Sequence, residues 1–322
     1  MEAREFRWGI LGPGRIAAKF AASLPFSLHG KLAAVSSTDK NRAREFAARF
    51  GAPYAFASDE ELLESGQVDA VYLSRPHSFH RRDAEKCLRR NIPVLCEKPL
   101  STSPEDSAFL CSLAASHHTF LMEGLWTSCL PSFLQALRWI REGRIGEVLH
   151  ASADFGHKAA MELEHRHFNP DLGGGVMKDI GIYPLALFMK VFGHGLSIQS
   201  AGLRLENGVD SQVIFQGKSA KGSGNFQGMV SFLAAGPSEA CITGTEGRIR
   251  FAPQWFRAVD VWLEIPGKEP EFFSGTGPGF GFQHEADEVE ACVRAGLTES
   301  SRWSHADSLE AARLIAAAEK FT

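Results

Sequence analysis

A glycine-rich turn near the N-terminus is the segment of this chain best suited to bind phosphate. A short apolar run reaches Gly12 and is followed by the pattern Gly-x-Gly-x-x-Ala and then by residues with helical spacing. A helix that begins at such a turn presents backbone N–H groups to an anion. Gly12 permits the tight turn, Gly14 lets the backbone approach the phosphates, and Ala17 lets the helix pack on the strand. The residues expected to bind the pyrophosphate of a dinucleotide are Gly12, Gly14, Arg15 and Ile16.

The end of the second predicted strand, residues 31–37, carries the side chains that would choose between two dinucleotides. Ser37 and Thr38 stand at its tip, and Arg42 follows about one helical turn later. Hydroxyl groups and a cation suit the 2′-phosphate of NADP, because charge-assisted hydrogen bonds to phosphate are strong. NAD is the alternative cofactor because of Asp39, which in a slightly different register would be the carboxylate that binds the ribose diol. We expect NADP, with NAD as the alternative.

Two further segments place titratable side chains where proton chemistry is possible. Lys98 lies in a Glu-Lys-Pro turn after an apolar strand, and so at the ligand-binding edge of a parallel sheet, unless the turn is merely exposed. Asp179 and Tyr183 follow three glycines and are four residues apart, which puts them on one face if the segment is helical. Pro184 then requires either the first helical turn or a kink. The alternative is that Asp179 caps a helix and Tyr183 is a core aromatic.

Strand and helix patterns alternate over the first part of the chain, as in a parallel sheet whose strands are joined by helices. Right-handed crossovers bring the carboxyl ends of such strands to one edge, where the glycine turn, the tip of the second strand and the turn at Lys98 would lie. The sequence therefore predicts a doubly wound, dinucleotide-binding Rossmann domain over residues 1–126. Short apolar runs predict its later strands near residues 69–74, 93–96 and 120–123.

The pattern changes after Trp126. Short alternating segments between about residues 198 and 273, separated by Gly and Pro, predict a large, mostly antiparallel open sheet. We expect an α+β substrate-binding and dimerisation domain over residues 127–322, whose last helix either stays there or packs back on the first domain. The fold class is thus α/β, with a Rossmann domain followed by an α+β domain. Helical patterns in this part lie near residues 132–142, 173–192, 283–294 and 304–320.

Composition narrows the class of protein. The chain has 322 residues, 44% of them hydrophobic, and a net charge of −4, which gives no field that favours nucleic acid or an anionic membrane. No apolar stretch approaches the roughly 20 residues of a membrane span. The six cysteines are widely spaced, without a Cys-x-x-Cys pair, which favours free thiols in the cytoplasm. No set of His, Cys and Asp has metal-ligand spacing, so we expect no metal.

The motifs together resemble the family of glucose-fructose oxidoreductase and inositol 2-dehydrogenase. The resemblance is carried by the glycine turn, by Glu97-Lys98-Pro99 and by the glycine block that leads to Tyr183. Residues 121–127 and 179–183 are most similar to the dihydrodiol dehydrogenase subgroup, which includes NADP-linked D-xylose dehydrogenases. Tyr183 matches this subgroup, whereas many relatives have His there. Arg42 also matches, but the subgroup commonly has Arg where this chain has Thr38.

The resemblance implies an NADP-dependent oxidoreductase that moves a hydride between nicotinamide and a secondary alcohol of a sugar, polyol or dihydrodiol. Tyr183 would be the general acid/base. A free tyrosine has a pKa of about 10, and the nearby ammonium of Lys98 would lower it. Asp179 would position Lys98 or a substrate hydroxyl. In the alternative mechanism Lys98 itself transfers the proton, and Tyr183 serves only to orient the reacting groups.

The resemblance also assigns residues that spacing alone does not. It implies a homodimer formed through the C-terminal sheet. A basic cluster, residues 165–167, is interpreted as a solvated loop.

Two alternative functions remain: an NAD-preferring sugar or inositol dehydrogenase, and a non-catalytic NADP-binding sensor. The remaining cofactor-binding candidates are Pro76, His77, His80, Glu97 and Lys98, and the candidates for lining the substrate pocket are Trp126, Phe155 and Trp255.

Overall fold

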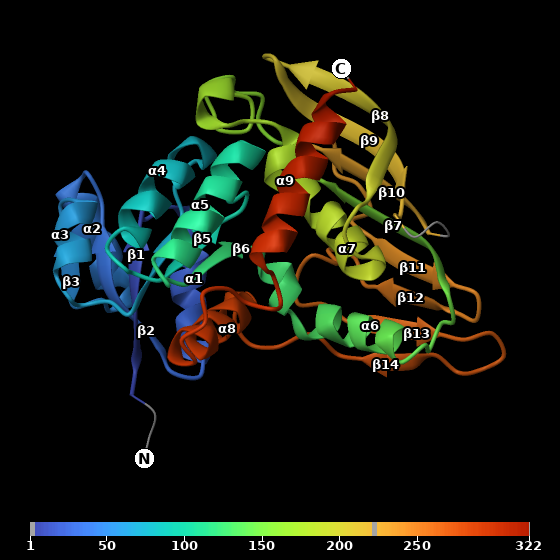
Figure 1. Ribbon diagram of the computed structural model, residues 1–322, viewed down its shortest axis with the longest axis horizontal. Helices are drawn as coiled ribbons and strands as arrows, with labels where there is room; N and C mark the ends of the chain where they lie inside the picture. The colour runs from blue at the N-terminus through green and yellow to red at the C-terminus, as the bar shows by residue number, and fades with distance from the viewer. Residues whose placement is uncertain (1–3, 221–223, 322) are drawn as a thin grey trace. The chain divides into compact units, whose positions relative to one another are not determined.

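A computed structural model describes residues 4–220 and 224–321 of the chain. It divides into two compact units, each taken by itself below (Figure 1). Unit 1 comprises the residues up to 101 together with 105–126 and 278–305. Unit 2 comprises 102–104, 127–277 and the residues from 306 onward. The chain thus leaves unit 1 after Trp126 and returns to it for one late segment, while the last helix belongs to unit 2.

Unit 1 is built on a six-stranded sheet of order β3-β2-β1-β4-β5-β6, in which every neighbouring pair is parallel. The strand order reverses between β1 and β4, which is the arrangement of a dinucleotide-binding Rossmann sheet. The predicted fold class of this part is confirmed. The strands are β1 (Phe6–Leu11), β2 (Gly30–Ser36), β3 (Tyr54–Phe56), β4 (Ala70–Leu73), β5 (Val94–Glu97) and β6 (Leu121–Gly124).

The helices of unit 1 begin and end at residues with a clear local reason. Asp39 caps α2 by accepting hydrogen bonds from two backbone N–H groups, and Gly51, at φ 73°, ends that helix in the left-handed conformation. The core beneath α1 contains Phe20 stacked on Tyr72 at 4.0 Å between ring centroids. The helices are α1 (Arg15–Ser23), η1 (Leu24–Phe26), α2 (Lys40–Phe50), α3 (Asp59–Glu64), α4 (His77–Leu88), α5 (Pro104–Ser116) and α8 (Phe282–Arg294).

Unit 2 is built on an eight-stranded sheet of order β14-β13-β12-β11-β7-β10-β9-β8. The pair β7–β10 is parallel and the other neighbouring pairs are antiparallel, so the expectation of a mostly antiparallel sheet is confirmed. The strands are β7 (Val148–Gly156), β8 (Ser197–Glu206), β9 (Val209–Lys218), β10 (Asn225–Ser231), β11 (Ala240–Gly244), β12 (Arg248–Phe251), β13 (Val261–Glu264) and β14 (Glu271–Phe273).

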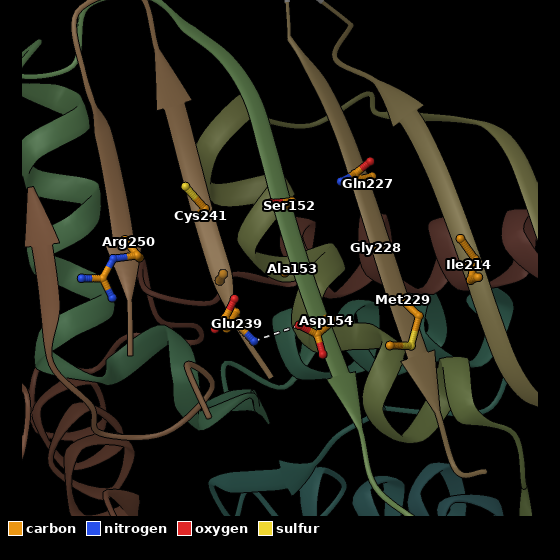
Figure 2. A pocket seen from close by; sticks show the side chains of 11 residues that line it. Ser152, Ala153, Asp154, Ile214, Gln227, Gly228, Met229, Glu239, Cys241 and Arg250 are labelled. Atoms are coloured by element: carbon orange, nitrogen blue, oxygen red, sulfur yellow. Dashed lines mark hydrogen bonds between the residues drawn. The ribbon is translucent and has the colours of Figure 1, made fainter. Parts of the chain in front are cut away.

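The helices of unit 2 cover one face of its sheet. Helix α7 packs on β7 and β10, and α6 packs on β13. On β9, Val213 and Phe215 are buried while Ile214 between them is 60% exposed. Figure 2 shows Ile214, Gln227, Met229, Cys241 and Arg250 standing on the other face of the sheet, around a hollow. The helices are η2 (Trp126–Cys129), α6 (Pro131–Arg141), η3 (Pro170–Leu172), η4 (Met177–Gly181), α7 (Ile182–Phe192) and α9 (His305–Glu319).

None of the helices in the described part of the chain has both the length and the apolar character that crossing a membrane requires.

Candidate active site

The glycine turn after β1 has the conformation that a phosphate-binding loop needs. Gly12 has φ 91°, and a Cβ there would lie 2.7 Å from Cγ of Arg75, so glycine is required. Gly14 stands at the N-cap of α1, where no side chain caps the helix. A Cβ added at Gly14 would meet, among the described residues, only the Gly12 carbonyl oxygen at 4.0 Å. The turn is thus packed at Gly12 and open at Gly14, where the N-terminus of α1, with Arg15 and Ile16, fits a pyrophosphate.

The tip of β2 places Arg42 against the same turn. Its Nε and Nη2 atoms donate to the carbonyl oxygen of Pro13 at 3.3 and 3.0 Å. The carboxylate of Asp39 caps helix α2, because Oδ1 accepts from the N–H groups of Asn41 and Arg42 at 2.9 and 3.2 Å. Ser37 is buried, and Thr38 is exposed beside it. The structure therefore brings the predicted arginine, but not a disengaged carboxylate, to the glycine turn.

Lys98 follows β5 in unit 1, at the carboxyl end of the sheet. The Lys98–Pro99 peptide bond is cis. Glu97 is buried, and its Oε1 accepts a hydrogen bond from the hydroxyl of Tyr72. Burial, together with the charge of Glu97, raises the pKa of the fully buried Glu285 carboxyl of α8 well above its usual range. Lys98 thus follows the carboxyl end of β5, and the residue before it, Glu97, is a buried polar group.

The loop after β4 leads into α4 and contains the other predicted cofactor residues. Pro76 is the N-cap of α4, His77 is its first residue and is 6% exposed, and His80 is fully buried. The ring nitrogens of His80 lie 2.7 Å from the carbonyl oxygen of Pro99 and 2.8 Å from that of Arg75. Burial is the main cause that lowers the pKa of His80. His80 therefore joins the β4–α4 loop to the turn that carries Lys98.

In unit 2, the buried carboxylate of Asp179 is paired with two basic side chains. Nη1 of Arg166 lies 3.0 Å from Oδ1, and Nε2 of His167 lies 3.5 Å from Oδ2. Burial outweighs the charge of Asp179 and lowers the pKa of His167 to about 4. Residues 165–167, interpreted above as a solvated loop, are partly exposed, but Arg166 also pairs with the buried carboxylate of Asp179, because a buried charge needs a partner that compensates it.

Asp179 lies in a π-helical turn, η4, rather than in an uninterrupted α-helix. Oδ2 of Asp210 on β9 accepts a hydrogen bond from the N–H of Met177 at 2.7 Å and so fixes the start of this turn. Gly175 precedes it with φ 121°, and a Cβ there would lie 2.4 Å from Oδ1 of Asp210. Pro184 falls in the first turn of α7, one of the two positions predicted for it.

Tyr183 belongs to an aromatic cluster. Its ring lies 5.4 Å from Phe155 and 5.7 Å from Phe256, and those two rings stack at 3.7 Å. Trp255 is fully buried and its indole N–H donates to the Asp154 carbonyl oxygen at 2.9 Å, so it is held in the core. Phe256, which the sequence analysis did not single out, is the neighbour of Trp255 that contacts Tyr183. In unit 1, Trp126 stacks on Phe282 at 4.4 Å.

Comparison with known proteins identifies the family to which these two units correspond. Residues 6–125 match a domain described as "Oxidoreductase family, NAD-binding Rossmann fold", and residues 133–250 match the "GFO/IDH/MocA C-terminal domain". The chain is 35% identical over 314 residues to a trans-1,2-dihydrobenzene-1,2-diol dehydrogenase of Danio rerio, covering 94% of this chain and 92% of that protein. The chain belongs to the GFO/IDH/MocA oxidoreductase family.

Other known proteins resemble the chain over nearly its full length. The human trans-1,2-dihydrobenzene-1,2-diol dehydrogenase is 32% identical, covering 91% of this chain and 90% of that protein. The structure of KijD10, a 3-ketoreductase from Actinomadura kijaniata in complex with NADP and TDP-benzene, is 26% identical with a TM-score of 0.85, covering 98% of each chain. The aldose-aldose oxidoreductase of Caulobacter crescentus, at 22% identity and a TM-score of 0.89 over 99% of this chain and 97% of that one, shares the fold.

As a GFO/IDH/MocA member, the protein is an NAD(P)-dependent dehydrogenase or reductase with a dinucleotide-binding Rossmann unit. The structure groups the predicted cofactor residues of unit 1 around the glycine turn, the β4–α4 loop and the turn at Lys98. In unit 2 it groups Asp179 with Arg166 and His167, and Tyr183 with Phe155 and Phe256. Within the described residues, no three His, Cys, Asp or Glu side chains are gathered as a metal ion would require. The sequence offered a cue for Arg166 and His167, a basic run before the triple glycine, but none for Phe256.

Proposed function

We propose that the protein is an NADP-dependent oxidoreductase that transfers a hydride between nicotinamide and a secondary alcohol of a sugar, polyol or dihydrodiol. The observation that carries the proposal is the likeness, over 94% of this chain, to a protein named trans-1,2-dihydrobenzene-1,2-diol dehydrogenase. KijD10, named a 3-ketoreductase, supports the same type of substrate, a carbinol or the corresponding ketone. Trans-dihydrodiols and D-xylose are therefore the first substrates to test.

The preference for NADP over NAD is supported by the environment of Arg42. Its guanidinium is anchored to the Pro13 carbonyl at the glycine turn, and Thr38 lies between β2 and the helix that carries Arg42. Asp39, the carboxylate that would bind the ribose diol of NAD, is engaged in capping α2. A cation held at the glycine turn favours a 2′-phosphate, since charge-assisted hydrogen bonds to phosphate are strong.

The chemistry divides between the dinucleotide and the chain. When bound, the nicotinamide supplies the carbon that accepts or donates the hydride. Tyr183 acts as general acid/base and takes the hydroxyl proton as the alcohol becomes a carbonyl. The ammonium of Lys98 stabilises the phenolate of Tyr183 and donates a hydrogen bond to the alkoxide that develops. KijD10 variants with a replaced lysine or a replaced tyrosine have been crystallised with NADP and TDP-benzene, so the two residue types have been probed in that protein.

Asp179 orients a substrate hydroxyl or Lys98. Its charge is compensated by Arg166, whose Nη1 lies 3.0 Å from Oδ1, and the ring of His167 lies 3.5 Å from its other oxygen, so the carboxylate has a neighbour on each side. Phe155, one of the three aromatic residues expected to line the substrate pocket, supplies with Phe256 an apolar wall next to Tyr183. Aromatic walls suit the C–H faces of a sugar or the ring of a dihydrodiol.

A second copy of the chain is the partner that we propose for the open face of the unit 2 sheet. Ile214 is 60% exposed at the centre of β9, and Met229 stands beside it on β10. Adjacent exposed apolar side chains on neighbouring strands form the kind of contiguous apolar surface that marks an interface, and Ile214 and Met229 are paired across β9 and β10. A location in the cytoplasm remains a prediction.

The test is a turnover assay of the purified protein with NADP+ or NAD+ and trans-1,2-dihydrobenzene-1,2-diol, D-xylose and a panel of pentoses and hexoses. We expect NADP+ reduction with at least one of them. Tyr183→Phe removes one oxygen and keeps the ring, so NADP binding survives while kcat falls by about 10²–10⁴-fold. Lys98→Met produces a similar loss and adds little in the double variant, because residues that act as a unit are not additive.

Three results would each reject part of this proposal. Binding of NADP without turnover of any substrate indicates a nucleotide sensor. Faster turnover with NAD+ indicates the NAD-preferring alternative. A Tyr183→Phe enzyme that keeps more than about a tenth of the wild-type kcat, outside the range for loss of a general acid or base, makes Tyr183 a packing residue and moves the proton to Lys98.

A further inference from the structure

The backbone on both sides of Lys98 is held by buried groups of unit 1. From residue 94 to residue 100, every residue is buried except Lys98 itself. A lysine ammonium sits on a flexible four-carbon stem. The position of the charge therefore depends on how firmly the peptide beneath that stem is fixed.

His80 fixes the side that follows the lysine. Its two ring nitrogens face two backbone carbonyl oxygens, that of Pro99 at 2.7 Å and that of Arg75 at 2.8 Å. The ring is fully buried. The ring is thus packed between two backbone segments of unit 1, although the family resemblance placed His80 among the cofactor-binding residues. His80 instead connects the turn after β5 with the loop before α4.

Glu123 at the end of β6 fixes the next residue. Its Oε1 accepts from the N–H of Leu100 at 2.7 Å, and its Oε2 accepts from Nε1 of Trp303 at 2.8 Å. The carboxylate is 3% exposed and Trp303 is fully buried. Close packing of the strands supports this contact, because a Cβ at Gly124 would lie 3.2 Å from the Cys96 carbonyl oxygen. Two successive backbone groups after Lys98 thus each have a buried, ionisable partner.

We propose that His80 and Glu123 are positioning residues that hold the turn of Lys98 so that its ammonium meets the reacting oxygen. The inference rests on the catalytic role proposed for Lys98. It assigns His80 to the lysine rather than to the dinucleotide, and it gives a function to Glu123, a buried residue of the segment 121–127 to which the sequence analysis gave no role. A displacement of about 1 Å at a catalytic group is enough to cost about 10²-fold in rate.

The test compares His80→Gln with His305→Gln in the full-length protein. His305 is a matched control, because its Nε2 lies 3.0 Å from the Leu121 carbonyl oxygen at the opposite end of β6, away from Lys98. We expect His80→Gln to lower kcat about 10–100-fold while the Kd for NADP, titrated by fluorescence, changes less than about threefold. His305→Gln keeps the wild-type kcat. In a Lys98→Met background, His80→Gln causes no further loss of kcat, because its effect passes through the missing ammonium.

Several outcomes overturn the inference. A Kd for NADP that rises in step with the loss of kcat makes His80 a cofactor residue. A loss that persists in the Lys98→Met background, or no loss at all, shows that the lysine is not the target. If His80→Gln does not fold, Glu123→Gln is measured in the same way, and failure of both to fold assigns the two residues to stability. An active Lys98→Met enzyme instead rejects the proposed mechanism itself, whatever the His80 variants do.

Discussion

At the scale of single residues, Arg42 provides the most direct test of cofactor choice. Arg42→Ala removes a cation that we expect to contact the 2′-phosphate, and loss of such a contact costs about 1.5–3 kcal/mol. The Kd for NADP should therefore rise roughly 10- to 150-fold, while the Kd for NAD is unchanged. Arg44→Ala, an exposed arginine two residues along the same helix, is the control. Equal affinity of the wild-type protein for NAD and NADP would contradict the prediction.

His167 makes the folding stability depend on pH. Burial lowers its pKa to about 4, below the 6.5 of a free histidine, so the folded protein favours the uncharged ring. This contribution is complete above pH 6.5 and is lost as the pH falls towards 4. For one such group the loss between pH 7 and pH 5 is about 2 kcal/mol at most.

The expected result is a smaller acid effect in a variant that cannot take up this proton. His167→Phe preserves the stacking on Phe232, whose ring centroid lies 4.5 Å away. Its melting temperature should drop less between pH 7 and pH 5 than that of the wild-type protein, as measured by circular dichroism. His118→Asn, at an exposed histidine with φ 48°, should melt like the wild type at both pH values. If His167→Phe loses as much stability in acid as the wild type, the titrating group lies elsewhere.

Single residues differed in how far the sequence could predict them. The glycines, Lys98 and Tyr183 lie in local patterns, and their elements follow from those patterns. The contact of Phe256 with Tyr183 arises from packing between segments 73 residues apart in the chain, whereas the partners of Asp179 lie only 12 and 13 residues before it, in a loop whose path the sequence pattern does not indicate. Phe256 comes directly after a tryptophan of similar hydrophobicity, and the sequence does not show which of the two rings is turned towards Tyr183.

At the scale of elements, substitutions at the two glycines of the turn should differ in their effects on folding stability and on NADP binding. In Gly12→Ala the new Cβ clashes with Cγ of Arg75, and φ 91° is strained for alanine, which costs about 1–2 kcal/mol. Gly14 has φ −102° and open space, so Gly14→Ala leaves the melting temperature unchanged. Its methyl group occupies the space through which the pyrophosphate approaches, and the Kd for NADP should rise about tenfold or more, or ~1.4 kcal/mol.

The comparison of the two variants is made by thermal melting and by titration with NADP. Gly12→Ala should lose both stability and affinity, and Gly14→Ala affinity alone. Wild-type affinity in Gly14→Ala would mean that this turn does not hold the cofactor.

Elements with strong periodicity were predicted well, and short or irregular ones were not. The helix patterns near residues 132–142 and 283–294 correspond to α6 and α8 within a residue or two at each end. The three-residue strand β3 was missed, because so short an edge strand has no alternation to detect. The π-helical turn before α7 was missed as well, since it depends on Asp210 of β9, which contacts it from another part of the sequence.

At the scale of the whole molecule, the open sheet face leads to a prediction about oligomeric state. We expect light scattering at micromolar concentration to give about twice the chain mass of 35.2 kDa. Ile214→Asp should shift the protein towards the monomer, because burying an unpaired carboxylate costs several kcal/mol. Leu28→Asp, at a residue that is 76% exposed in unit 1, should keep the wild-type mass. A wild-type mass of one chain would reject the interface.

The general architecture could be predicted because both sheets have characteristic patterns. Alternating strands and helices indicate a parallel sheet, and short strands separated by Gly and Pro indicate an antiparallel one. The assignment of residues 278–305 to unit 1 could not be predicted in this way. It depends on contacts such as that between Trp303 and Glu123, whose residues are 180 positions apart.

That late segment has a consequence for how the protein is made. Because α8 packs on α1, and Phe282 on Trp126, the Rossmann unit is complete only after residue 305 has left the ribosome. At about 5–20 residues per second, the first 126 residues wait roughly 10–40 s for their missing helix. During that interval the nascent chain exposes apolar surface that α8 will later cover. Chaperone binding to the partly synthesised chain, and proteolysis of a fragment that ends at residue 126, follow from the order of segments in the sequence.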